Sequence, residues 1–134
     1  MAAPESERKI RILIAEDDPV QGRLLEECLH RNGFEVCGPF ARCCDASEAA
    51  LREDVDAALL DVSLEGGNSA AAASALRDRS IPFAFLTGYG PETAPVIGSF
   101  SDNLAIPKPI SPDILDEVLG VLLSKQKQRA DYHS

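Results

Sequence analysis

The chain has 134 residues and a formal net charge of −9, with 45% hydrophobic residues and no tryptophan. This length suits one domain with one aliphatic core, and the negative charge repels phosphate backbones, which argues against direct nucleic-acid binding. No apolar run approaches the roughly 18 residues that a membrane-spanning helix needs, and the N-terminal residues lack the apolar segment of a signal peptide, so we expect a cytoplasmic protein with no membrane partner.

The first strand and helix are marked clearly. Residues 10–15 are aliphatic and predict a strand, which ends at the three carboxylates of residues 16–18. A helix over 19–32 follows, with Asp18 as its N-cap, proline as its first residue and the glycine at 33 as its terminator. Its apolar side chains form two adjacent stripes, which are Val20, Leu24 and Cys28, and beside them Leu25 and Leu29.

The same alternation continues with a weak strand at 34–38 and a helix at 45–52, then a strand at 57–62, a loop at 63–69 and an alanine-rich helix to about residue 79. A strand at 81–87 and a small strand near 104–106 enclose a segment rich in glycine and proline, in which we expect only a short or irregular helix. The serine and proline at 111 and 112 open a last helix with two apolar stripes. These are Ile114, Val118 and Leu122, and Leu115 and Leu119.

Five alternations of strand and helix predict a parallel sheet with helices on both faces, an α/β doubly wound fold. We expect the flavodoxin-like strand order 2-1-3-4-5, in which ligands bind at the carboxyl ends of the strands. Four of the five strands end at a chemically active side chain. These are Glu16 and Asp17 after the first strand, Asp61 after the third, Thr87 after the fourth and Lys108 after the fifth.

The carboxylates of Glu16, Asp17 and Asp61 would repel one another at this edge unless a cation lay between them. A few carboxylates, with the other positions left to water, backbone and phosphate, suit Mg²⁺ better than an all-protein calcium site. Asp61 then has nucleophilic potential, because its carboxylate beside the metal can take up a phosphoryl group as an acyl phosphate. Lys108 would supply a second positive charge, and the Thr87 hydroxyl would hydrogen-bond a phosphoryl oxygen.

The segments AEDD, LLDVSL, LTG and PKP at these strand ends resemble, in combination, the receiver domain of two-component response regulators across about residues 9–125. The resemblance implies a cis peptide bond between Lys108 and Pro109, which the tertiary amide of an X-Pro bond makes accessible. It also implies the residues of the site: Asp61 as the phospho-acceptor, Glu16, Asp17 and Asp61 as Mg²⁺ ligands together with the Ser63 backbone carbonyl, and Thr87 and Lys108 as the side chains that sense the phosphoryl group.

The segment PFAFLTGYG is similar to a subfamily of alphaproteobacterial receivers with a FATGY signature, found as single-domain proteins and at the ends of hybrid sensor kinases. Leu86 departs from the alanine of that signature. Most receivers carry an aromatic side chain three residues before the lysine, which rotates on phosphorylation, and here that position is Ala105. Tyr89, in a glycine-flanked loop two residues after Thr87, is a candidate for replacing that switch.

The domain organisation follows from the resemblance. We expect a flexible N-terminal segment at 1–8, a receiver domain at 9–125 and a polar C-terminal tail at 126–134. The expected function is a stand-alone receiver that takes a phosphoryl group from a histidine kinase or phosphotransfer protein onto Asp61 and signals to a downstream protein by direct contact. It would not be an enzyme, apart from Mg²⁺-dependent self-phosphorylation and self-dephosphorylation at Asp61.

Three alternatives stay open. The chain could be the excised receiver domain of a hybrid histidine kinase. It could be a phosphatase with an aspartyl nucleophile. Such enzymes usually need a second aspartate, two residues after the nucleophile, as general acid and base, and here that position is Ser63. A flavodoxin-like cofactor binder is the third, although the strand-end loops lack a phosphate loop rich in serine, threonine and glycine.

The four cysteines have neither the spacing nor the neighbouring histidines of a zinc site. We expect all four, Cys28, Cys37, Cys43 and Cys44, to be free thiols, and the alternative is a redox role for the adjacent Cys43 and Cys44.

Overall fold

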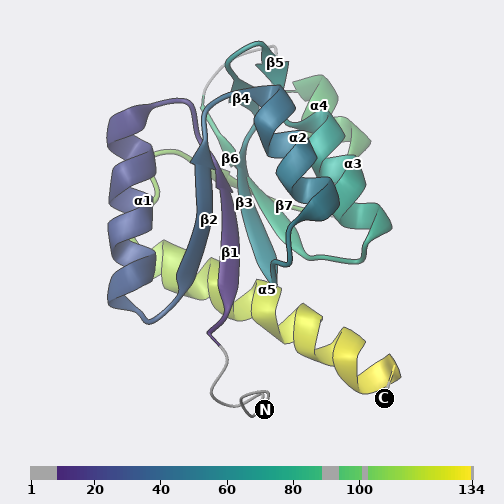
Figure 1. Ribbon diagram of the computed structural model, residues 1–134. Helices are drawn as coiled ribbons and strands as arrows, with labels where there is room; N and C mark the ends of the chain where they lie inside the picture. The colour runs from purple at the N-terminus through teal and green to yellow at the C-terminus, as the bar shows by residue number, and fades with distance from the viewer. Residues whose placement is uncertain (1–8, 89–93, 101–102, 134) are drawn as a thin grey trace.

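The computed structural model describes residues 9–88, 94–100 and 103–133 (Figure 1). The strands are β1 (Arg11–Ala15), β2 (Glu35–Phe40), β3 (Ala57–Asp61), β4 (Ser63–Leu64), β5 (Gly67–Asn68), β6 (Phe83–Thr87) and β7 (Leu104–Pro107). The helices are α1 (Pro19–Arg31), α2 (Cys43–Arg52), α3 (Ala70–Asp78), α4 (Ala94–Ser99) and α5 (Pro112–His133). Within the described residues, none of these helices has an apolar run that would span a bilayer.

Five parallel strands form the central sheet, in the order β2-β1-β3-β6-β7. β4 and β5 form a separate antiparallel hairpin, so this order is the predicted 2-1-3-4-5 when only the strands of the main sheet are counted. α1 and α5 cover one face of the sheet, and α2, α3 and α4 cover the other (Figure 1). The predicted doubly wound fold is therefore confirmed, and all five strands end at one edge.

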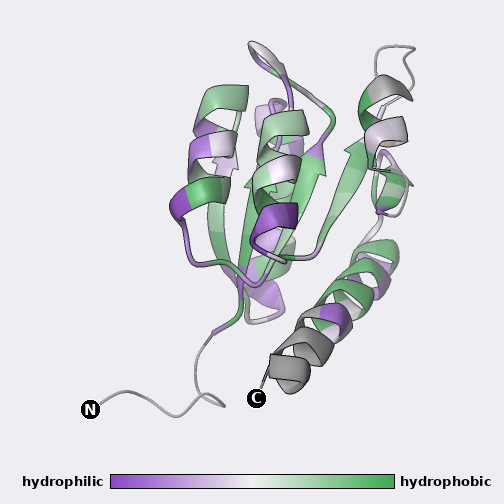
Figure 2. Cartoon of the chain, turned by 90° about the vertical axis from the view of Figure 1, so that its right-hand side faces the viewer, coloured by the Kyte–Doolittle hydropathy of each residue, from purple (hydrophilic) through white to green (hydrophobic). Residues whose placement is uncertain are grey.

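Side chains along each strand alternate between two apolar layers. Ile12 and Ile14 of β1 pack with α1 and α5, whereas Leu13 and Ala15 pack with α2 and α3. The strands are hydrophobic along most of their length, while the helices that cover them also carry hydrophilic residues (Figure 2). This pattern is typical of a parallel sheet that is covered on both faces.

The start of α1 is set by its cap. The Asp18 carboxylate accepts hydrogen bonds from the backbone N–H groups of Val20 at 2.9 Å and Gln21 at 3.4 Å, and Pro19 is the first helical residue, as predicted. The helix ends at Arg31, before Gly33 with its φ of +86°. Because Asp18 is used by the helix, the two carboxylates before it are left at the end of β1.

The segment 63–69, expected as a loop, contains the β4–β5 hairpin, and α2 begins at Cys43, two residues earlier than expected. Backbone hydrogen bonds join the two regions. The Glu65 N–H donates to the Ala41 carbonyl at 3.0 Å, and the Cys43 N–H donates to the Glu65 carbonyl at 2.9 Å. Such long-range bonds leave no local pattern in the sequence, which explains both differences.

The apolar stripes are not all buried. On α1, Leu25 and Leu29 face the core, but Val20 and Leu24 are 66% and 60% exposed. On α5, Ile114 is also exposed, although the rest of both predicted stripes is buried. α5 continues to His133, through the segment expected as a polar tail. Helical spacing identifies apolar stripes, but it does not tell which of two neighbouring stripes meets the sheet.

Gly38 lies where β2 passes the end of β1. Its φ is +113°, and an added Cβ would lie 2.6 Å from the carbonyl oxygen of Ile14. The Gly38–Pro39 peptide bond is cis, and the strand then pairs Phe40 with Ala15. Only glycine has both the backbone freedom and the small size that this position requires.

We predict that Gly38→Ala lowers the free energy of unfolding by more than about 2 kcal/mol, because the side chain adds backbone strain to a steric clash. Gly120 in α5 is the matched control, since an added Cβ there meets no atom within 4 Å. Gly120→Ala should be neutral or stabilise the protein by up to about 1 kcal/mol. Urea unfolding measures both, and equal stability of the two variants would contradict the prediction.

Candidate phosphoryl-acceptor site

The ends of three strands bring Glu16, Asp61 and Lys108 into direct contact. Glu16 follows β1, Asp61 ends β3 and Lys108 follows β7. The Lys108 ammonium donates to Asp61 Oδ2 at 2.9 Å and to Glu16 Oε1 at 3.2 Å. Because Glu16 and Asp61 are only 3% and 5% exposed, this ammonium neutralises negative charge where little water is present to do so.

Asp17 completes an acidic cluster at the same edge. One carboxylate oxygen from each of Glu16, Asp17 and Asp61 lies within 4.8 Å of the other two. Asp17 is exposed, whereas the other two residues are buried, so the cluster opens to solvent on the Asp17 side. The structure thus brings together the three carboxylates that the strand ends indicated.

Glu16 is held in place by backbone groups. Its N–H donates to the Phe40 carbonyl at 2.9 Å, and its Oε1 accepts from the Asp18 N–H at 3.1 Å. Gly22 of α1 lies close by: an added Cβ would be 3.3 Å from the Pro39 ring and 3.7 Å from Glu16 Cγ. No local sequence signal marks Gly22 and Pro39 as part of the site, because their contact joins two separate elements.

The buried charges alter one another's ionisation. Burial raises the pKa of Glu16 to about 7, and the charge of Asp61 adds to the rise, while the Asp18 N–H and the Lys108 ammonium act in the opposite direction. For Lys108, burial alone would lower the pKa, but the hydrogen bonds to Asp61 and Glu16 outweigh it and raise the pKa above the usual value. The carboxylates therefore keep Lys108 charged, and Glu16 is the group that resists ionisation.

For three further predicted residues, Thr87, Ser63 and Tyr89, the structure does not test the predicted role. Thr87 ends β6 half-buried, and its carbonyl accepts a hydrogen bond from the Lys108 N–H at 2.8 Å. The Lys108–Pro109 peptide bond is cis, as predicted. Ser63 begins β4 just after the end of β3, and its carbonyl as a metal ligand stays a prediction. Tyr89 lies outside the described residues.

The donor set fits Mg²⁺. Oxygen ligands of an octahedral Mg²⁺ lie within about 4 Å of one another. One oxygen from each of the three carboxylates already lies within 4.8 Å of the other two. Lys108 balances only one of the three carboxylates. Glu16 Oε2 is buried and accepts no hydrogen bond from the described residues, although the ammonium lies 3.1 Å away. A divalent cation would supply the missing charge and use the free lone pairs of Glu16 and Asp17.

Comparison with known proteins agrees with this geometry. The family model for the response regulator receiver domain matches residues 12–119. The transcriptional activator protein PfeR of Pseudomonas aeruginosa is 33% identical over 119 residues, which cover 86% of this chain and 38% of PfeR. The chain spans less than half the length of the curated relatives that it matches.

Two solved structures are similar. The CheY-like receiver domain protein of Methanospirillum hungatei JF-1 superposes with a TM-score of 0.80 at 24% identity, covering 91% of this chain and 99% of that one, which shows the shared fold. SdrG of Sphingomonas melonis Fr1 gives a TM-score of 0.73 at 34% identity, covering 86% of this chain and 97% of that one. Because the family model matches most of the chain, this protein belongs to the response regulator receiver domain family.

Proposed function

We propose that this chain accepts a phosphoryl group on Asp61 in a Mg²⁺-dependent reaction and signals by contact with another protein. The donor would be a histidine kinase or a histidine phosphotransfer protein. The observation that carries the proposal is the Lys108 ammonium bridging Asp61 and Glu16, with Asp17 beside them at the open edge of the sheet. A purely structural ion pair would not need a third carboxylate at that place.

Phosphoryl transfer to Asp61 requires a nucleophile and positive charge near the phosphoryl oxygens. An Asp61 carboxylate oxygen attacks phosphorus, the bond from phosphorus to the donor's imidazole nitrogen breaks, and the leaving imidazole takes up a proton. Mg²⁺, held by Glu16, Asp17 and Asp61 with the Ser63 carbonyl, would neutralise phosphoryl charge. Lys108 already lies 2.9 Å from Asp61 and would pair with a phosphoryl oxygen once the carboxylate becomes an acyl phosphate. Thr87, on the neighbouring strand, would donate its hydroxyl to the same group.

We propose no enzymatic activity beyond self-phosphorylation and self-dephosphorylation at Asp61. Self-dephosphorylation needs only water to attack the acyl phosphate, with Mg²⁺ in place. A phosphatase with an aspartyl nucleophile would need an acid and base near Asp61, and residue 63 is a serine. Nothing in the described part of the chain supports that alternative or the flavodoxin-like one.

The surface of α1 supports docking of the phosphodonor. Val20 and Leu24 are exposed apolar side chains on the helix that begins just after the acidic cluster. An apolar helix face of a histidine protein could rest on them with its imidazole turned toward Asp61. A cytoplasmic location follows from this proposal, because the kinase domains that phosphorylate receivers work there.

We also propose that the chain acts as a stand-alone receiver of the subfamily with the FATGY signature. The segment PFAFLTGYG supports the subfamily, and the match to SdrG, 34% identical over 97% of that solved chain, supports a receiver of single-domain size. The alternative is the receiver domain of a hybrid histidine kinase. The mass of the protein in its own cell, 14.4 kDa for this chain alone, decides between them.

Of the three predictions that follow from this proposed function, the first concerns the acceptor. With Mg²⁺ and acetyl phosphate, intact-mass measurement should show one added phosphoryl group, which hydroxylamine removes as expected for an acyl phosphate. Asp61→Asn should show none, whereas Asp116→Asn, on the exposed side of α5, should behave as the parent protein. A phosphoryl group that persists in Asp61→Asn would overturn the assignment.

The second prediction uses the raised pKa of Glu16, about 7 against an ordinary value near 4.5. A carboxyl whose pKa is raised on folding favours the folded state below pH 4.5 and loses this contribution as the pH rises through 7. In EDTA, the melting temperature of Glu16→Gln should therefore exceed that of the parent by a margin that grows from pH 5 to about 8.

Mg²⁺ should then reverse this order, because only the parent has the full ligand set and gains stability on binding. Glu117→Gln, at an exposed position in α5, is the matched control and should follow the parent at every pH. A pH-independent difference between Glu16→Gln and the parent would contradict the prediction.

The third prediction concerns the switch. Ala105 is exposed on β7 and cannot act as an aromatic rotor, so we propose that Tyr89 moves when the Thr87 hydroxyl turns toward the phosphoryl group. Beryllium fluoride should shift amide resonances over residues 103–119 in the parent and in Tyr89→Phe. Tyr89→Ala should lose most of these shifts while still accepting a phosphoryl group. Equal shifts in all three proteins would show that the switch lies elsewhere.

A further inference from the structure

A cavity of about 280 Å³ lies between α1 and the start of α5, on the face of the sheet opposite α2 and α3. Its floor is made by the buried side chains of Leu25, Leu86 and Leu115, and its sides by Leu24 and Ile110. The volume is near the lower end of the range for small-molecule pockets, and an apolar lining with a few polar groups is typical of such pockets.

The cavity has a structural cause. The backbones of α2 and α3 lie close together on their face of the sheet, whereas the backbones of α1 and α5 stay farther apart (Figure 1). Side chains of both helices meet in one apolar core, but part of the space between α1 and the start of α5 is left open as this cavity. Leu24 lies at the border of the cavity and is 60% exposed. An apolar ligand in the cavity would cover the Leu24 side chain and remove it from water.

The two ends of the cavity differ in charge. At the end near the phosphoryl-acceptor site, Glu16 and Lys108 pair with each other. At the other end stands Arg31, the last residue of α1, which forms no ion pair with any described residue. On the outer side of the same helix, by contrast, Arg23 pairs with Glu27 at 3.5 Å. Lys108 is shared between Glu16 and Asp61, so the end near the phosphoryl-acceptor site keeps an excess of negative charge. Arg31 places a positive charge at the far end, where an anionic group is favoured.

We propose that this cavity binds a small apolar carboxylic acid, with its carboxylate on the Arg31 guanidinium and its hydrocarbon part over Leu25, Leu86 and Leu115. Arginine matches a carboxylate with two parallel hydrogen bonds. The distance along α1 from Gln21 to Arg31, about 15 Å at 1.5 Å per residue, accommodates a short acid lengthwise. The proposal does not depend on phosphotransfer, since it needs only the cavity and the charge at its end.

A ligand bound in the cavity would alter the surroundings of the phosphoryl-acceptor site. Glu16 and Lys108 form part of the cavity wall and of the acidic edge at once. If the acid changes the affinity for Mg²⁺, Mg²⁺ must change the affinity for the acid by the same factor. The ligand would therefore be a modulator of the receiver rather than a substrate.

The test compares phenylbutyrate with its neutral amide, phenylbutyramide, by NMR titration of the full chain. With a net charge of −9, an unspecific apolar hollow would prefer the amide, so a preference for the acid is diagnostic of Arg31. The acid should bind about three- to fivefold more tightly than the amide, as one exposed charge pair allows. Arg31→Gln should abolish this preference, and Arg23→Gln should retain it.

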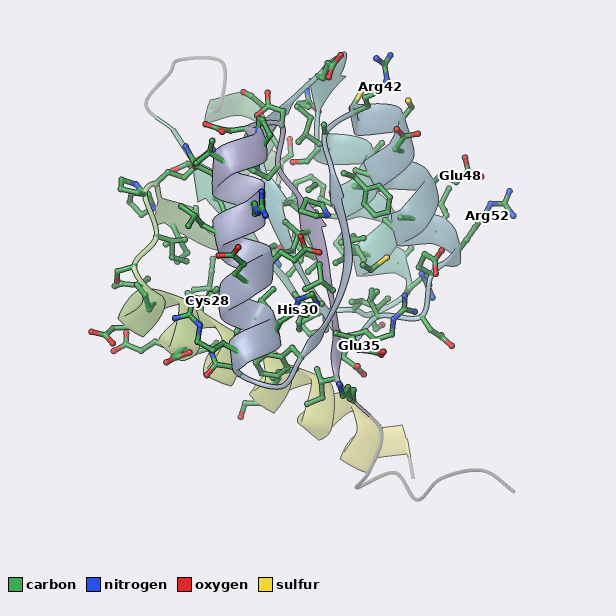
Figure 3. All side chains as sticks on the ribbon, turned by 60° about the vertical axis from the view of Figure 1, so that its left-hand side comes forward. Cys28, His30, Glu35, Arg42, Glu48 and Arg52 are labelled. Carbon is green, nitrogen blue, oxygen red and sulfur yellow. The ribbon has the colours of Figure 1, made fainter. Side chains whose placement is uncertain are left out.

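A second readout places the ligand. Cys28 lines the cavity and Cys44 is exposed on α2, and both thiols are free. Cys28 and His30 project from different sides of α1, and Cys28 lies on the side toward the start of α5 (Figure 3). Saturating phenylbutyrate should slow alkylation of Cys28 by iodoacetamide severalfold, as followed by peptide mass mapping, while Cys44 reacts at its original rate.

The proposal fails if the amide binds as tightly as the acid, or if Arg31→Gln keeps the preference for the acid. It fails equally if Cys28 and Cys44 are protected to the same extent, because the acid then binds without regard to the cavity. Resonances that do not shift at millimolar phenylbutyrate would show that the cavity accepts no small acid.

Discussion

The contact on which the site depends is that of the Lys108 ammonium with Asp61 and Glu16. Two buried carboxylates this close would otherwise disfavour folding, because each loses hydration and repels the other. The lysine reaches them from the opposite half of the sheet, so the strand order places it there rather than any local motif. The hydrogen bond from its own N–H to the Thr87 carbonyl then fixes the backbone from which it reaches.

The two faces of the sheet are built differently, and the difference bears on function. Alanines on α2 and α3 let these helices pack closely on one face, where Phe83, Phe85 and Phe100 meet edge to face. On the other face, α1 and α5 share an apolar core but leave a cavity between α1 and the start of α5, and the apolar side chains of Val20 and Leu24 remain exposed. The close-packed face supports the sheet, while the open face offers the surfaces that a partner or ligand can use.

Much of this could be predicted from the sequence, because a parallel sheet gathers residues by strand order alone. Once the alternation of strands and helices is recognised, Glu16, Asp61 and Lys108 must approach one edge, whatever the loops do. What the sequence could not show depends on contacts between elements: the β4–β5 hairpin held by Ala41 and Cys43, the fit of Gly22 against Pro39, and the choice of the buried stripe on α1. Each is decided by a neighbour far away in the chain.

The charge balance at the edge of the sheet explains why the site should respond to its ligands. One ammonium cannot neutralise three carboxylates, and burial has already raised the pKa of Glu16 to about 7. The repulsion among these carboxylates opposes folding, and a divalent cation bound between them would relieve it and so stabilise the folded protein. Phosphorylation would change the balance again, since the acyl phosphate replaces the single charge of Asp61 by a larger one spread over more oxygens. In the proposed reaction, Lys108 would pair with Asp61 before phosphorylation and with the phosphoryl group afterwards, because its ammonium already lies 2.9 Å from Asp61 Oδ2. A change in the position of Lys108 would then be the first structural consequence of phosphorylation.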